Sequence, residues 1–236
     1  MSSKTMAVAA LAAALATSGT AAADKGTGTI AGAVSWKGAP PPRPELDRST
    51  DPVCAKIKRL GEDVVVEAGK LRDVHVRLAN GSAGTHAAPA TPVVVVQSEC
   101  MYGPRVVGLV AGQALEIRNA DATFHNVRGN LGTKILWNLG QAAQQPAITR
   151  KDLGAAGDVV SLHCDVHPWM AGWAVITDHP YFAVTGADGA FVLKDVPVGT
   201  YTLEAWHPTL GLKTAKVKVT RGKTAKATFT FAAAKP

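Results

Sequence analysis

The chain has 236 residues, with 25 Lys and Arg against 18 Asp and Glu, so its formal net charge is +7 at pH 7. This length suits one large or two small domains. Aromatic residues do not alternate with the basic ones in either basic cluster, 56–59 or 216–226, which argues against a nucleic-acid-binding surface. We expect a solvated basic face, with docking to an acidic protein partner as the alternative.

The first 23 residues have the layout of a secretory signal peptide. Lys4 precedes an apolar, Ala-rich run over 6–16, and three alanines at 21–23 form a small-residue cleavage site before Asp24. The apolar run is too short to cross a bilayer, which makes a retained anchor the weaker alternative. We expect a periplasmic or secreted mature chain without a membrane span, with charge +6 because cleavage removes only Lys4.

The rest of the chain predicts an all-β protein with few or no long helices, because Gly and Pro are plentiful and Val and Thr recur in short runs. In chain order, strands are expected over 29–36, 64–66, 74–78, 93–97, 106–110, 114–118, 159–164, 172–177, 191–193, 197–206, 216–220 and 226–231. Residues 49–60 are expected to contain a short helical turn near Cys54. Residues 80–91 are expected to form a linker, and 130–156 a polar, irregular segment.

One thiol, two imidazoles and one thioether are spaced so that they could converge on a single metal ion. Cys164, His167 and Met170 follow one another at intervals of three after a predicted strand, and Pro168 stiffens the turn between them. His125 lies at a separate junction of strand and loop. Two His and one Cys with a weak axial Met are the ligand set of a blue-copper electron-transfer centre. The pattern therefore predicts a redox-active copper site.

Two segments carry a resemblance to a known family. Residues 106–127, ending in His125-Asn126-Val127, resemble the cupredoxins around their first copper histidine. The Cys-x-x-His-Pro-x-Met run at 164–170 resembles the copper loop of plastocyanin-like and amicyanin-like domains. The resemblance implies a cupredoxin Greek-key β-sandwich holding one type 1 copper ion, with four ligands and one residue that braces the thiolate loop. Those ligands would be His125, Cys164, His167 and Met170, and the bracing residue Asn126.

Some features of this resemblance leave alternatives open. His163 departs from the family, in which an aromatic or aliphatic residue usually precedes the Cys. We expect it to point away from Cys164 and not to bind metal. Zinc competes for the same Cys and His ligands, although Met argues against it. The other histidines lack metal spacing and are expected to be structural or exposed: His75, His86, His179 and His207.

Three cysteines remain after cleavage, an odd number for an exported protein. If Cys164 binds the metal, Cys54 and Cys100 are left as a candidate disulfide, which an oxidising compartment would favour. Pairing of Cys164 with either of the others would abolish the metal site.

Two tryptophans flank the copper loop, Trp169 within it and Trp173 just beyond. Packing around the site is one interpretation. The other is an apolar docking patch around an exposed edge of His167, which would then be the electron portal.

The flanking blocks carry a second resemblance. Residues 183–191, with the hairpin signal Ala187-Asp188-Gly189, and residues 197–201 are similar to the carboxypeptidase regulatory-like, prealbumin-like β-sandwich. Its usual opening strand is similar to 28–34, which lies before the copper block. We therefore expect a cupredoxin domain, 91–179, inserted into a discontinuous sandwich formed by 24–90 and 180–236. The alternative is three blocks in a row, with 26–81 as an appended subdomain.

These features predict an exported type 1 copper protein that carries single electrons between periplasmic redox partners, without enzymatic activity or a small-molecule substrate. The alternative is a copper carrier or storage protein. A copper enzyme would need an open coordination position or a second metal centre, and the sequence contains no second His-rich cluster.

Overall fold

The computed structural model describes residues 26–233, so the expected signal peptide, 1–23, lies outside the described part. Nearly all regular structure in this part is β, from β1 to β18. The exception is η1 (Cys54–Lys56), a short 3-10 turn in the place expected for a helical turn near Cys54. Between residues 26 and 233, no helix has the length and apolar character needed to cross a membrane. The prediction of an all-β chain is confirmed.

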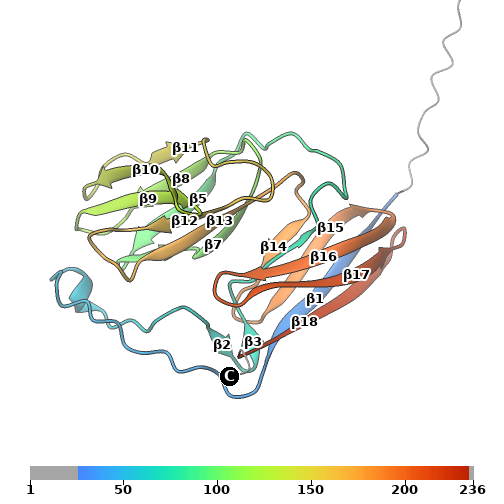
Figure 1. The fold of residues 1–236 in the computed structure, drawn as a ribbon, viewed down its shortest axis with the longest axis horizontal. Helices are drawn as coiled ribbons and strands as arrows, with labels where there is room; N and C mark the ends of the chain where they lie inside the picture. Colours follow the sequence, from blue (N-terminus) through green and yellow to red (C-terminus); the bar gives the residue numbers. More distant parts are fainter. Residues whose placement is uncertain (1–25, 234–236) are drawn as a thin grey trace, which may run out of the picture.

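Both ends of the described chain build the first sandwich. Its first sheet has the order β15 (Ala190–Pro197), β1 (Thr27–Lys37), β3 (Lys70–Leu71) and β2 (Val66–Glu67), with β18 (Thr224–Ala232) also paired to β1. Its second sheet has the order β14 (Phe182–Val184), β4 (His75–Leu78), β16 (Gly199–His207) and β17 (Gly211–Val219). Figure 1 shows β1, in blue, beside β18, in red, and the two strands are parallel.

The middle of the chain builds the second sandwich, which lies beside the first (Figure 1). One sheet has the order β10 (Lys134–Gln141), β9 (His125–Leu131), β12 (Val159–His163), β13 (Ala171–Thr177) and β7 (Val106–Val110). The other has the order β11 (Ile148–Arg150), β8 (Leu115–Asn119), β5 (Val93–Ser98) and β6 (Met101–Gly103). Two neighbouring pairs, β13 with β7 and β5 with β8, are parallel, and the other pairs of this sandwich are antiparallel.

Side-chain alternation explains why each sheet buries one face. In β16, Tyr201, Leu203 and Ala205 are buried and the residues between them are less so, as a strand with one face on a core requires. The second core contains Cys164 and Met170, so two of the expected metal ligands lie within a hydrophobic cluster.

The expectation of an irregular segment over 130–156 is wrong. Residues 134–141 form β10, which pairs with β9 around a tight turn at Gly132, where φ is +57°. The Trp137 side chain packs over Gly129, where an added Cβ would lie 2.2 Å from the ring. Only Trp137 and Gln141 are buried in this strand, so the apolar alternation that would have revealed it is weak.

One segment of the expected flanking block, 24–90, lies against the second sandwich instead of the first. From β1 the chain runs across to the second sandwich, where η1 lies, and back again to β2 (Figure 1). Cys54 belongs to the core of the second sandwich, although it lies within the expected flanking block. Residues 48–57 therefore contribute to the second sandwich.

Candidate metal centre

The pairing of two strands brings the expected ligands to one end of a sheet. His125 is the first residue of β9, and Cys164 directly follows the last residue of β12. These strands are antiparallel neighbours, so the start of one lies beside the end of the other. His167 and Met170 occupy the loop to β13, which the amide of Met170 tightens by donating to the carbonyl of His167 at 2.9 Å.

Three ligand atoms face one another at this end of the sandwich. His125 Nδ1 lies 2.9 Å from His167 Nδ1, and Cys164 Sγ lies 4.0 Å and 3.7 Å from these two nitrogens. A trigonal ion with ordinary bond lengths needs about 3.5 Å between nitrogens and about 3.7 Å from nitrogen to sulfur. The two distances to sulfur are close to this requirement. The two Nδ1 atoms would have to move apart by about half an ångström to bind such an ion.

The four expected ligands are buried, with at most 2% of any one side chain exposed. Met170 lies in the same core cluster as Cys164. One thiol sulfur and two imidazole nitrogens that face one another in this way are the kinds of donor atom that bind a transition metal. These residues therefore fit a metal ion, and Cys164 is the free cysteine of the described chain.

Asn126 holds the loop that carries Cys164. Its Oδ1 accepts from the amides of Asp165 at 2.7 Å and Val166 at 3.3 Å, and it lies 3.5 Å from Cys164 Sγ. Its Nδ2 donates to Asn138 and to the Asp165 carboxylate. This is the bracing contact that the resemblance implied for Asn126.

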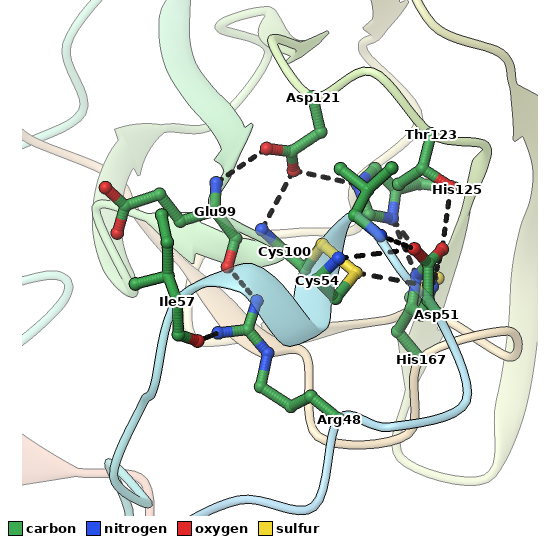
Figure 2. The surroundings of a disulfide bond; sticks show 12 residues. Arg48, Asp51, Cys54, Ile57, Glu99, Cys100, Asp121, Thr123, His125 and His167 are labelled. Atoms are coloured by element: carbon green, nitrogen blue, oxygen red, sulfur yellow. Dashed lines mark hydrogen bonds and ion pairs between the residues drawn. A yellow bond between two sulfur atoms is a disulfide. The ribbon is translucent and has the colours of Figure 1, made fainter.

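Cys54 and Cys100, the candidate pair, form a disulfide with a Cα–Cα distance of 5.6 Å. Figure 2 shows it joining η1 to the turn between β5 and β6, directly beside the two histidines. Both cysteines are buried, and Cys54 Sγ lies 3.6 Å from His167 Nε2.

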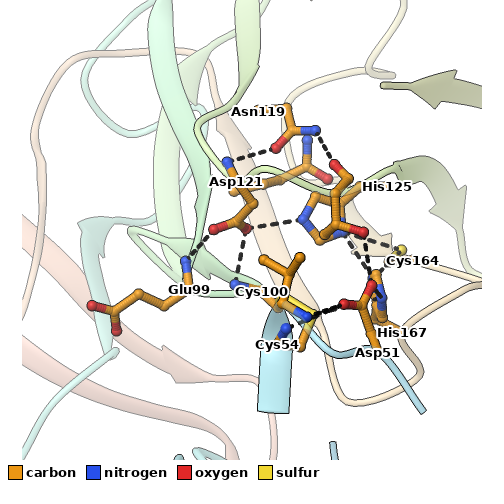
Figure 3. A network of polar contacts seen from close by, with 12 residues as sticks. Asp51, Cys54, Glu99, Cys100, Asn119, Asp121, His125, Cys164 and His167 are labelled. Atoms are coloured by element: carbon orange, nitrogen blue, oxygen red, sulfur yellow. Dashed lines mark hydrogen bonds and ion pairs between the residues drawn. A yellow bond between two sulfur atoms is a disulfide. The ribbon is translucent and has the colours of Figure 1, made fainter. Parts of the chain in front are cut away.

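The sequence interpretation missed two carboxylates at the site. Asp121 Oδ2 accepts from His125 Nε2 at 2.9 Å, and Asp51 Oδ2 accepts from His167 Nε2 at 3.0 Å (Figure 3). Asp121 stands four residues before His125 in the segment that carried the resemblance, so that spacing could have indicated it. Asp51 lies 116 residues from His167, and no local pattern reveals it.

The structure contradicts the docking-patch interpretation of Trp169 and Trp173, which required an exposed edge of His167. No part of His167 is exposed, because Asp51 and Cys54 cover its Nε2 side. Trp169 is half-buried; its ring centroid lies 5.1 Å from that of His167, and its Nε1 donates to the carbonyl of Cys100 at 3.0 Å. These contacts favour the packing interpretation of Trp169.

Burial and hydrogen bonding act in opposite directions on the site's ionisable groups. Burial alone would raise the pKa of Cys164, but hydrogen bonds from His125 and from backbone amides outweigh it and lower that pKa. Burial alone would lower the pKa of His125, yet Asp121 and Cys164 raise it to about 9. For His167, burial dominates over Asp51 and the pKa is lowered. A depressed thiol pKa favours the thiolate, the form that binds metal.

The other histidines lie apart from the site. His75, His179 and His207 are fully buried, and His86 and His163 are half-buried. His75 stacks on Phe182, and His179 Nε2 bonds to the carbonyl of Leu78. Within residues 26–233, every group of side chains suited to a metal includes His125 or His167.

Comparison with known proteins finds one family model and several solved structures that are similar to parts of this chain. The family model of the β-sandwich domain of ER membrane protein complex subunit 7 matches residues 167–235. It covers less than half of the chain and is a different family from the carboxypeptidase regulatory-like one expected for this block. No curated protein matches the chain.

Among solved structures, a purple cupredoxin from Nitrosopumilus maritimus is 17% identical, with 36% of this chain and 99% of that chain covered and a TM-score of 0.31. Amicyanin from Paracoccus versutus is 21% identical, with coverages of 42% and 97% and a TM-score of 0.32. A copper-containing nitrite reductase from Thermus scotoductus SA-01 is 17% identical, with coverages of 44% and 25% and a TM-score of 0.34.

The described chain thus contains two β-sandwiches, one built from its middle and one from its two ends. Similarities at this identity and TM-score assign neither a fold family nor a function. The assignment of a metal centre rests on the ligand geometry of this chain.

Proposed function

We propose that this chain is an exported type 1 copper protein that carries single electrons between redox proteins. The supporting observation is the buried convergence of Cys164 Sγ, His125 Nδ1 and His167 Nδ1, with Met170 in the same core. One thiolate, two imidazoles and one thioether suit copper in both oxidation states, whereas structural zinc sites use Cys and His without Met. When bound, copper supplies a centre that gains and loses one electron.

The protein's part in this function is to keep the ligands in place while the charge changes. Asn126 holds the Cys164 loop through two backbone amides, and the 2.9 Å bond from Met170 N to His167 O fixes the spacing of the last two ligands. The surrounding core excludes water. A site that rearranges little between two charge states has a low barrier to electron transfer.

Because His167 is covered, the electron must cross the protein surface elsewhere. Phe124, next to His125, is 47% exposed, and Val166, between Cys164 and His167, is 50% exposed. Phe124 and Val166 are each covalently bonded to a proposed ligand residue, His125 and His167 respectively. Both side chains are apolar, as the centre of a transient docking site requires. The net charge of +6 expected for the mature chain favours an acidic protein partner.

The copper carrier remains the competing function. A carrier must release its ion to a partner, and full burial of His125 and His167 behind Asp51 and the disulfide opposes ready release. We likewise propose that the protein is not an enzyme, because four ligands leave no open position for a substrate. These arguments favour electron transfer.

The flanking sandwich is proposed to be a carboxypeptidase regulatory-like scaffold that presents the copper domain. Residues 183–191 and 197–201 carry that resemblance. The pairing of β1 with β18 joins the two ends of the described chain in one sheet of this sandwich. A periplasmic or secreted location is proposed on the signal-like first 23 residues and on the disulfide, which persists in oxidising compartments.

The test is to load the mature protein with Cu(II) and record visible and EPR spectra. An intense thiolate-to-copper charge-transfer band with narrow hyperfine splitting is expected. His163→Ala, next to Cys164 but outside the ligand set, serves as the control and should keep the spectrum. A colourless protein, or a tetragonal signal without Cys164, would overturn the proposal. Rapid redox cycling without loss of copper would exclude the carrier, whereas transfer of Cu(I) to a chelator would favour it.

A further inference from the structure

Two carboxylates make the same pair of contacts on opposite sides of the disulfide. Asp51 accepts from His167 Nε2 through Oδ2 and from the amide of Cys54 through Oδ1. Asp121 accepts from His125 Nε2 and from the amide of Cys100, both through Oδ2. Each carboxylate thus links one metal-binding histidine to the backbone of one disulfide cysteine, and the disulfide links the two halves (Figures 2 and 3).

Both carboxylates accept further hydrogen bonds. Asp51 accepts from Thr123 Oγ1 at 2.7 Å and from the amide of Val53 at 2.7 Å. Asp121 accepts from the amide of Glu99 at 2.6 Å. Side chains held by three or four hydrogen bonds have little freedom to move, so each carboxylate sets where its histidine can lie.

The turn that carries Cys100 depends on the same contacts. Glu99 and Cys100 both have positive φ, near +53° and +54°, a conformation that residues other than Gly adopt at a cost. Asp121 binds the amides of both residues, and the disulfide holds Cys100 from the other side. The brace at His125 is therefore built on a turn that these contacts stabilise.

We propose that Asp51 and Asp121 are positioning residues of the metal centre, and that the Cys54–Cys100 disulfide joins them into one brace that aims both Nδ1 atoms at Cys164 and favours Cu(II) over Cu(I). This inference rests on the proposed copper function. It also assigns residues 48–57 to the copper centre, although they lie outside the strands of its sandwich.

The physical basis is the choice of tautomer. A carboxylate at Nε2 holds the proton on that nitrogen and leaves the Nδ1 lone pair free for a metal. It also makes the imidazole more basic, which stabilises the more highly charged ion. The disulfide is fully buried, with Cys54 1% and Cys100 0% exposed, so a reductant cannot reach it and it acts as a permanent tie.

A purely structural role is the competing explanation for Asp51, because its bonds to the amides of Val53 and Cys54 stabilise the start of η1. Asp51→Asn separates the two roles. An Asn can still accept from these amides, but it does not hold the imidazole proton as a carboxylate does. Asp121→Asn tests the other half of the brace. Asp47→Asn is the matched control, since Asp47 lies on the same segment and, within residues 26–233, its carboxylate accepts hydrogen bonds only from Ser49.

The experiment measures copper affinity and reduction potential of the full mature chain. It also measures the histidine tautomers of the metal-free chain by nitrogen NMR at an alkaline pH, where both imidazoles are neutral. Loss of a partner that orients a ligand lowers metal affinity by roughly 10- to 100-fold. We expect Cu(II) affinity to fall more than Cu(I) affinity in Asp51→Asn and Asp121→Asn. A tenfold difference between the two would raise a one-electron potential by about 59 mV. In the metal-free variants, the Nε2–H tautomer of the affected histidine should lose population, and Asp47→Asn should change none of these values.

Unchanged affinity, potential and tautomer in both Asn variants, with only a lower melting temperature, would overturn the inference. If either Asn variant fails to fold, the Cys54→Ser/Cys100→Ser double variant provides the test. We expect this double variant to bind copper more weakly and to have a raised reduction potential. Unchanged copper affinity and reduction potential would contradict the inference. Absence of the charge-transfer band in the wild type would refute the copper function itself. The tautomers of the metal-free protein would still report whether the carboxylates position the histidines.

Discussion

Both sandwiches bury histidines completely, yet the pKa of His125 in the second shifts in the opposite direction from those of His75 and His207 in the first. In the first, burial lowers the pKa of His75 to about 3 and that of His207 to about 4, so both are neutral. Neither ring nitrogen of His75 has a hydrogen-bond partner within residues 26–233. In the second, burial also opposes charge on His125, but Asp121 and Cys164 raise its pKa to about 9. The acidic partners in the pocket of His125 thus reverse the effect that burial has on the pKa of His75 and His207.

The largest effect should come from removing the thiolate. Cys164→Ser should abolish the charge-transfer band, because the hydroxyl cannot supply the sulfur ligand on which that band depends. Copper at 100 times its dissociation constant stabilises a protein by about 2.7 kcal/mol, so it should raise the melting temperature of the wild type far more than that of this variant. Calorimetry with and without copper measures the difference, and equal shifts would show that copper binds elsewhere.

Removal of the disulfide should follow in size. Its 46-residue separation predicts a loss of about 4 kcal/mol in the free energy of unfolding of the metal-free Cys54→Ser/Cys100→Ser variant. Urea titration measures this loss, and metal-free Cys164→Ser, which removes a thiol without breaking a crosslink, is the control. A loss below about 1 kcal/mol would mean that other contacts hold η1 against the second sandwich.

A core truncation in the first sandwich tests whether the two regions are separate. Leu203 is fully buried there, so Leu203→Ala should cost about 3 kcal/mol through lost burial and the cavity that remains. The copper spectrum should stay unchanged, because the ligands lie in the other core. A shifted spectrum in protein that is still folded would show that the first sandwich controls the metal site.

The pH dependence of stability should differ in sign between the regions of the metal-free protein. His75 is protonated more readily in the unfolded chain than in the folded one. The free energy of unfolding therefore falls as pH falls from about 6.5 towards 3, by at most about 1.4 kcal/mol per pH unit. His125 acts in the opposite direction: its stabilising contribution is complete below about pH 6.5 and is lost as pH rises through about 9. Urea titrations across this range should give a shallower acid slope in His75→Leu, and an unaltered slope would contradict a buried, neutral His75.

Much of the fold and part of the site could be predicted because their signals are local. Alternation in segments such as 201–205 identifies a strand with one buried face, and Cys164, His167 and Met170 lie on one loop. Strand β10 was missed because it buries only Trp137 and Gln141, and its pairing with β9 supplies the order that its own sequence does not encode.

The sequence by itself determined an all-β chain and which thiol, imidazoles and thioether could share a metal, since a ligand loop is a matter of spacing along the chain. Only the tertiary structure decided the surroundings of that loop. It brings Asp51 to His167 across 116 residues, covers the imidazole edge expected to be exposed, and places the Cys54–Cys100 disulfide against it. Such contacts depend on how two distant segments pack, and no residue pattern within either segment specifies the other.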